Sequence, residues 1–221
     1  MEIFLLVTSL VACAAWRVKL REQGLRIALL ASHLGKYQIE KLLETLTQGY
    51  QRALGEADAT RQAQVFTLLQ ATEQDLASQF DRLAADFARA DGELTRVSRL
   101  PVYLPYAVQL FPAATFDLRQ ALTLHARGIG LAVRGSEAVP HKERAFTISA
   151  ELFLMQHSCH WFCKSKMVAS ARMIARHQTS YPQLVSGVTA QTREAYIALV
   201  GSEESARQTA HEACHAGPSP A

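Results

Sequence analysis

The chain contains few charged and few aromatic residues. Asp, Glu, Lys and Arg make up 19% of its 221 residues, less than the usual quarter of a soluble protein, and only 8% are aromatic. Seven prolines and 11 glycines exclude collagen-like and low-complexity material, and four cysteines are too few for a disulfide scaffold. A net charge of +3 does not by itself indicate nucleic-acid binding. Because 49% of the residues are hydrophobic, the chain can bury a core, which excludes global disorder.

The N-terminus carries an uncharged run of 14 residues from Ile3 to Trp16, followed by Arg17, Lys19 and Arg21. The run is shorter than the roughly 20 residues of a typical spanning helix, but the long basic side chains can extend from the apolar region to the headgroups. Cations after the run place the rest of the chain in the cytoplasm by the positive-inside rule. We therefore expect a single-pass membrane anchor in residues 1–21. Its marker residues are Ile3, Phe4, Leu5, Leu6, Trp16, Arg17, Lys19 and Arg21.

Two other interpretations of this run compete with the anchor. Leu10 to Cys13 resembles a lipoprotein signal in which Cys13 would be lipidated, but Glu2 and the lack of basic residues before the run do not fit a signal peptide. An apolar run of this length also fits a buried helix of a soluble protein. The ratio of 17 arginines to 6 lysines is typical of a GC-rich genome, and we expect the anchor to lie in a bacterial inner membrane.

Residues 22–99 show the periodicity of a helical hairpin. Apolar residues at spacings of three and four predict one helix from Glu22 to about Leu54, followed by a turn near Gly55. Alternating steps of three and four from Phe66 to Val97 give ten positions, of which nine are apolar and one is Glu73. This heptad spacing is typical of a coiled coil or a long bundle helix, either paired within the chain or self-associating. The predicted interaction seam consists of Phe66, Leu69, Leu76, Phe80, Leu83 and Phe87.

Residues 100–116 contain no charged side chain and carry three prolines, Pro101, Pro105 and Pro112. The prolines prevent one continuous helix, and an open coil cannot span a bilayer because its backbone would lack hydrogen-bond partners. The segment is therefore either an apolar crossover packed over the bundle or a segment that contacts the membrane interface or a partner.

A compact helical domain is predicted for residues 117–201. Asp117 can cap a helix that ends near Val133, Lys142 to His177 is predicted as one long helix, and a short helix runs to Val200. No alternation long enough for a strand is present, and residues 202–221 are predicted as a weakly ordered tail. The fold class is thus all-α, with an anchor, a hairpin of coiled-coil character and a compact helical bundle.

His157, Cys159, His160 and Cys163 form the most unusual cluster of the sequence. On a helix, Cys159 and Cys163 share one face and His160 lies three residues from His157 and from Cys163. Thiolates and imidazoles at this spacing can bind zinc or copper, although one helix supplies only two or three ligands. The same residues are also ordinary core residues, so a packed core without a cofactor is the competing interpretation.

His211-Glu212-Ala213-Cys214-His215 matches the H-E-x-x-H pattern of zinc proteases. The chain ends six residues later, without room for the usual downstream ligand, so we expect no enzyme here. Lys164, Arg172 and Arg176 lie on one helix face, which is typical of a solvated surface, and no motif indicates nucleic-acid binding.

These patterns favour a non-enzymatic, membrane-anchored cytoplasmic protein that scaffolds or docks protein partners or self-associates through its helices. The alternative hypothesis is a metal- or redox-sensing protein that uses Cys159, His160 and Cys163, with zinc as the metal.

Overall fold

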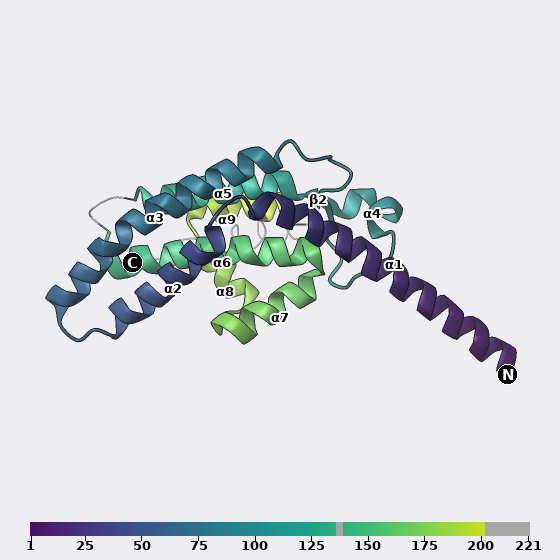
Figure 1. Ribbon diagram of the computed structural model, residues 1–221. Helices are drawn as coiled ribbons and strands as arrows, with labels where there is room; N and C mark the ends of the chain where they lie inside the picture. The colour runs from purple at the N-terminus through teal and green to yellow at the C-terminus, as the bar shows by residue number, and fades with distance from the viewer. Residues whose placement is uncertain (136–138, 202–221) are drawn as a thin grey trace, which may run out of the picture.

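The computed structural model describes residues 1–135 and 139–201, and over these residues the chain is mostly helical (Figure 1). The predicted all-α class is confirmed. The elements are, in chain order, α1 (Glu2–Leu34), α2 (Ile39–Gly55), α3 (Ala59–Phe87), β1 (Arg96–Ser98), α4 (Ala107–Leu110), the 3-10 turn η1 (Pro112–Ala114), β2 (Thr115–Asp117), α5 (Leu118–Val133), α6 (His141–Cys163), α7 (Lys166–His177), α8 (Tyr181–Gly187) and α9 (Ala190–Val200).

The second half of α1 and the elements α2 to α9 pack together, and we call this part of the chain the body. Its core lies between α3, α5 and α6. Helices α2 and α3 form an antiparallel hairpin, α3 packs on α5, and α5 packs on α6 (Figure 1). Helix α9 covers α5, while α7 and α8 lie against α6. The six seam residues of α3 are all buried in this core, so the heptad face of α3 is covered by helices of the same chain.

Helix α1 differs from the prediction at the expected boundary between residues 21 and 22 and at its C-terminal end. The anchor run and the residues after it form one uninterrupted helix, and the predicted helix from Glu22 to Leu54 is broken between Leu34 and Ile39. Side chains of α3 stabilise the break. The Tyr37 hydroxyl donates to the Asp86 carboxylate at 2.8 Å, and the backbone amide of Gln38 donates to the side-chain oxygen of Gln79 at 2.7 Å. These partners are more than 40 residues away along the chain, so local periodicity does not reveal them.

The heptad pattern continues beyond the end of α3. The helix stops at Phe87, and Val97 reaches the core from strand β1 instead. Strand β1 pairs antiparallel with β2, with Val97 opposite Phe116. The expectation of a chain without strands is therefore wrong at this point, because strands of three residues are too short to show alternation.

The predicted helix from Lys142 to His177 is also two helices. Helix α6 ends at Cys163, and Ser165 caps α7 by accepting the Val168 amide at 3.4 Å. Pro182, which was expected to terminate this region, lies in the first turn of α8, where its missing N–H costs nothing. The predicted cap at Asp117 is confirmed, since its carboxylate accepts the Arg119 amide at 2.9 Å.

The one charged position of the heptad face is buried with partners. Glu73 is 3% exposed and accepts hydrogen bonds from the Tyr50 hydroxyl at 2.7 Å and from the Arg144 guanidinium. Arg144 also donates to the Val133 carbonyl at 2.9 Å. Side chains or backbone of α2, α3, α5 and α6 therefore meet at this ion pair, which fixes their relative positions.

Replacing Arg144 by Met should lower the free energy of unfolding by about 3–5 kcal/mol, because buried Glu73 would lose its cationic partner and keep only the Tyr50 hydroxyl. Urea unfolding of the full-length protein in detergent measures this loss. Arg61→Met is the matched control, since the Arg61–Asp58 pair is 71% and 50% exposed and should contribute less than about 1 kcal/mol. Equal effects of the two substitutions would contradict the assignment.

Gly128 of α5 faces side chains of α6 and α9 with no room for a Cβ. A Cβ at this position would collide with Thr192 Oγ1 and Glu151 Oε2, whereas a Cβ at Gly24 of α1 would meet nothing within 4 Å. Gly128→Ala should therefore cost about 1–3 kcal/mol through overpacking, and Gly24→Ala should stabilise its helix by about 0.5–1 kcal/mol. Opposite shifts of the urea midpoint are expected, and a stabilising Gly128→Ala would contradict the packing described.

Candidate membrane-anchoring site

The first half of α1 projects from the body as a free helix (Figure 1). A helix of 33 residues is about 50 Å long at 1.5 Å per residue. Its most apolar 18-residue window has a mean hydropathy of 1.8 and none of it is buried, so this helix is long and apolar enough to cross a membrane. A signal sequence would meet the same criteria of length and composition.

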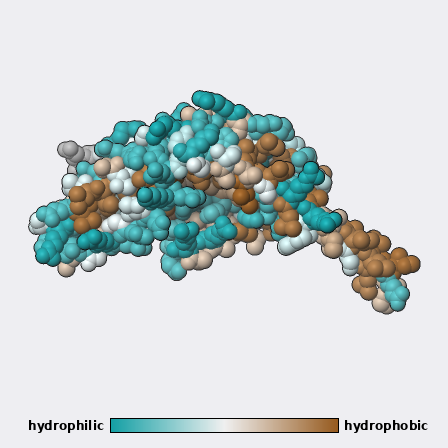
Figure 2. All heavy atoms as spheres, viewed as in Figure 1, coloured by the Kyte–Doolittle hydropathy of each residue, from teal (hydrophilic) through white to brown (hydrophobic). Residues whose placement is uncertain are grey.

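The apolar side chains of the projecting part are largely exposed. Ile3, Phe4, Leu5 and Leu6 are between 59% and 78% exposed, and Trp16 is 58% exposed. Figure 2 shows the projecting helix covered with hydrophobic side chains. The interpretation of this run as a buried core helix is therefore wrong for this structure. A continuous apolar surface of this size is typical of a membrane or protein contact.

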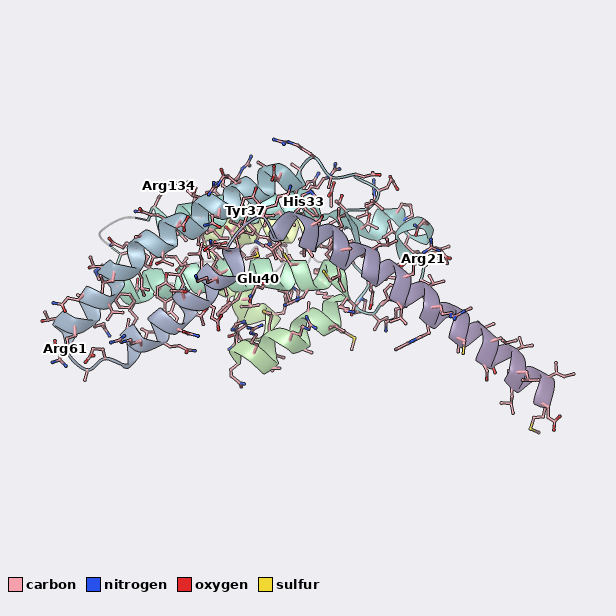
Figure 3. The ribbon with its side chains drawn as sticks, in the orientation of Figure 1. Arg21, His33, Tyr37, Glu40, Arg61 and Arg134 are labelled. Carbon is pink, nitrogen blue, oxygen red and sulfur yellow. The ribbon has the colours of Figure 1, made fainter. Side chains whose placement is uncertain are left out.

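Cations surround the point where α1 meets the body. Arg17, Lys19 and Arg21 follow the apolar run within two turns, and Figure 3 shows Arg21 near the point where α1 reaches the end of the body. The Lys19 ammonium lies 5.0 Å from the Trp16 ring centroid and 5.8 Å from that of Tyr103. Aromatic rings and long basic side chains at one level are typical of the boundary between acyl chains and headgroups.

The second half of α1 is docked firmly on the body. The Tyr103 hydroxyl donates to Glu22 at 2.5 Å, the Lys164 ammonium donates to Gln23 at 3.0 Å, and the Arg26 guanidinium donates to the Phe162 carbonyl at 3.3 Å. Gln23 is only 5% exposed. The projecting part is therefore directly continuous with the docked part, because one unbroken helix runs through both.

A cavity of about 210 Å³ lies at this junction. Leu25 and Arg26 of α1 form one side, and Leu94, Tyr103 and Trp161 are among the residues that line the rest. The Trp161 indole donates to the Ser98 carbonyl at 2.9 Å, which fixes the wall formed by α6. The cavity is mainly apolar, with charged groups among its lining residues.

The Cys and His cluster of α6 does not come together as one site. Cys159 packs beside Met155, with 3.9 Å between the sulfur atoms, while the His157 ring bonds to Ser170 at 3.1 Å. His160 faces Arg172 of α7 at 3.2 Å. Within the described ranges 1–135 and 139–201, no group of three His, Cys, Asp or Glu side chains is placed to hold a metal ion.

Partial burial makes both thiols of this cluster weak nucleophiles. It raises the pKa of Cys159 to about 12, and it raises the pKa of Cys163 as well. The thiolate is the reactive form, so neither free thiol is prepared for nucleophilic attack at neutral pH. Sequence spacing on one helix does not reveal this, because the neighbours that bury the thiols come from other elements.

A buried polar network that the sequence did not indicate lies beside this cluster. His125 of α5 bonds to Ser158 of α6 at 2.9 Å, and Ser158 lies 3.4 Å from the Tyr196 hydroxyl of α9. The side chains of all three are 0% exposed, so the network has no opening to a substrate and joins three helices inside the core. Its one sequence signal is a histidine on the apolar face of the helix from Leu118 to Val133.

The buried histidines make the body sensitive to acid. Burial lowers the pKa of His125 to about 3, and burial together with the positive charge of Lys166 lowers the pKa of His157 to about 3. In the unfolded chain both imidazoles titrate near pH 6.5. The unfolded state therefore binds more protons between about pH 6.5 and 3, and these groups contribute stability above pH 6.5 that is lost as the pH falls.

Lowering the pH from about 7 to about 5 should therefore reduce the free energy of unfolding by about 2 kcal/mol for each of the two histidines. Urea unfolding of the full-length protein at a series of pH values measures the slope. His125→Gln keeps a hydrogen-bonding group next to Ser158 and should reduce this loss by about 2 kcal/mol, the share of one histidine. An unchanged slope in this variant would show that His125 does not carry the acid sensitivity.

Comparison with protein-family models, with curated proteins and with solved structures found no match to this chain. The H-E-x-x-H pattern at His211 to His215 and the tail 202–221 lie outside the described residues. The N-terminal helix and its junction with the body are thus the feature of this structure that most directly indicates a function.

Proposed function

We propose that this chain is a single-pass membrane protein whose first helix holds a non-enzymatic helical scaffold or docking domain at the cytoplasmic face of a membrane. The observation that carries the proposal is the exposed apolar half of α1, which continues without a break into a half that is docked on the body. A rigid connection of this kind holds the body at a defined distance and orientation from the bilayer.

The length of the apolar part fits a bilayer. From Ile3 to Leu20 the helix rises by about 27 Å, close to the roughly 30 Å of a hydrocarbon core. The ammonium and guanidinium groups of Lys19 and Arg17 can reach the headgroups from this position. The three cations lie on the side of the body, which supports a cytoplasmic location for residues 22–201 by the positive-inside rule.

Partner docking is proposed on the outer faces of the body. The seam residues of α3 are covered by α2 and α5, so self-association through this seam would require the hairpin to open. The tip of the α2–α3 hairpin lies at the end of the body opposite the N-terminus, where Figure 3 shows Arg61. A surface at this end stays accessible when the body is held at a membrane. The metal- or redox-sensing alternative has less support, because Cys159 packs beside Met155 while His157 and His160 face Ser170 and Arg172 of α7.

Charges placed in the projecting helix should abolish membrane attachment without unfolding the body. Leu6 and Val11 are 64% and 62% exposed, so Leu6→Glu/Val11→Glu should leave the melting temperature unchanged. Each acidic side chain adds a cost of about 2–4 kcal/mol in the acyl region, so the protein should move from the membrane fraction to the carbonate-soluble fraction. Leu68→Glu, at a leucine of α3 that is 77% exposed, is the matched control and should stay in the membrane.

A C-terminal reporter that fluoresces only in the cytoplasm, paired with one that is active only outside it, tests orientation in the same cells. Membrane-bound fluorescence with an intact N-terminus by mass spectrometry is expected. Activity outside the cytoplasm, with a mass that shows cleavage or lipidation at Cys13, would instead establish a signal sequence and overturn the proposal.

A further inference from the structure

We propose that the body makes a second contact with the membrane, through an apolar apron that lies in the lipid interface beside the anchor. The apron consists of Val102, Leu104, Tyr106, Leu110 and Phe111. The inference rests on the proposed anchoring by α1 and specifies how the body is then oriented. This end of the body contacts the bilayer surface and is not surrounded by cytoplasm alone.

The apron is unusually exposed for large apolar side chains. Its five members are between 40% and 62% exposed and lie within ten residues of one another. Met167 extends the surface, because its backbone amide donates to the Pro101 carbonyl at 3.0 Å and its own side chain is 57% exposed. Figure 2 shows hydrophobic side chains gathered at the end of the body from which α1 leaves. Contiguous exposed apolar surface of this kind is typical of a binding or membrane contact.

The apron lies at the level of α1 where the headgroups are expected. Tyr103, near the start of the segment, donates a hydrogen bond to Glu22, and its ring is 5.8 Å from the Lys19 ammonium. These contacts hold the segment beside α1 within one turn of the cationic stretch that ends at Arg21. Figure 1 shows α4 beside α1 at the point where the helix leaves the body.

The chemistry of the segment fits shallow insertion and excludes spanning. Residues 100–116 carry no charge, so no ion has to be desolvated at the interface. The amides of Leu110 and Phe111 donate to the carbonyls of Tyr106 and Ala107, both at 2.9 Å. Pro112 has no backbone N–H and therefore adds no donor. The exposed part of the segment therefore presents few unsatisfied backbone donors to the lipid.

Lipid is a better occupant of this surface than a second copy of the chain or a soluble partner. The anchor brings the apron to the bilayer in every molecule, at an effective concentration that no free partner reaches. Arg17, Lys19 and Arg21 surround the base of the helix and complement the anionic headgroups of a cytoplasmic leaflet. Tyr106 and Phe111 contribute the aromatic rings that are enriched at membrane interfaces.

The test places an environment-sensitive fluorescent amino acid at Leu110 of the full-length protein, and at Leu68 in the matched control. Leu110 and Leu68 are 62% and 77% exposed, so neither replacement removes a core contact. The proteins are reconstituted in vesicles of phosphatidylethanolamine and phosphatidylglycerol whose acyl chains are brominated. The probe at Leu110 should lose roughly half or more of its fluorescence to bromine quenching, because the apron would reach the boundary of the acyl chains. The probe at Leu68 should lose none.

A second pair of variants tests which side chains make the contact. Phe111→Glu, in the protein that carries the probe at Leu110, should abolish the quenching while the protein still floats with the vesicles. Phe146→Glu replaces an equally exposed aromatic residue of α6, 54% against 46%, and should leave the quenching unchanged. Melting temperatures of both variants establish that the fold is retained.

The outcomes separate this inference from the anchor. A protein that does not float with the vesicles would refute the anchor and with it the apron. A protein that floats but shows equal, low quenching at Leu110 and Leu68 would refute the apron alone. The probe at Leu110 could instead show a blue shift without bromine quenching. If this blue shift depended on the protein-to-lipid ratio, it would assign the surface to a second copy and also overturn the inference.

Discussion

The direction of the projecting helix depends above all on the docking of the second half of α1 onto the body. In the docked half of α1, Glu22 accepts a hydrogen bond from Tyr103 and Gln23 accepts one from Lys164. Arg26 donates to the Phe162 carbonyl at the end of α6. Because a helix transmits orientation through its own hydrogen bonds, these contacts also fix the direction of the exposed apolar half. If they were absent, the N-terminus would be a flexible tether, and the body could take any orientation at a membrane.

Inside the body, buried polar groups determine which arrangement of helices is adopted. The pair between Glu73 and Arg144 joins the hairpin to α5 and α6, and the network from His125 to Tyr196 joins α5, α6 and α9. Apolar helix faces alone allow several packings of similar energy, whereas each buried polar group must find its partner. We infer that these groups select one packing, at the cost of sensitivity to acid through the two buried histidines.

The same arrangement of helices explains the structural roles of two conspicuous sequence patterns, the heptad face of α3 and the Cys and His residues of α6. The heptad face of α3 is used to build the core, so a pattern typical of a coiled coil here serves packing within the chain. Cys159 and Cys163 do share a face of α6, as the spacing predicts, but α1 and α7 pack against α6 and the thiols are partly buried. In both cases the periodicity identified the face correctly, and only the neighbouring helices decided its role.

The amino-acid sequence by itself determined the all-α class, the buried face of α3, the cap at Asp117 and the uncharged N-terminal run with its basic flank. These features depend on residues close together in the chain, whose propensities and spacings act locally. The tertiary structure decided where helices break and what their side chains meet. The breaks after Leu34 and Cys163, the strand pair of β1 and β2 and the partners of Glu73 all depend on residues tens of positions away. Local periodicity carries no information about such partners, because they are brought together only by packing.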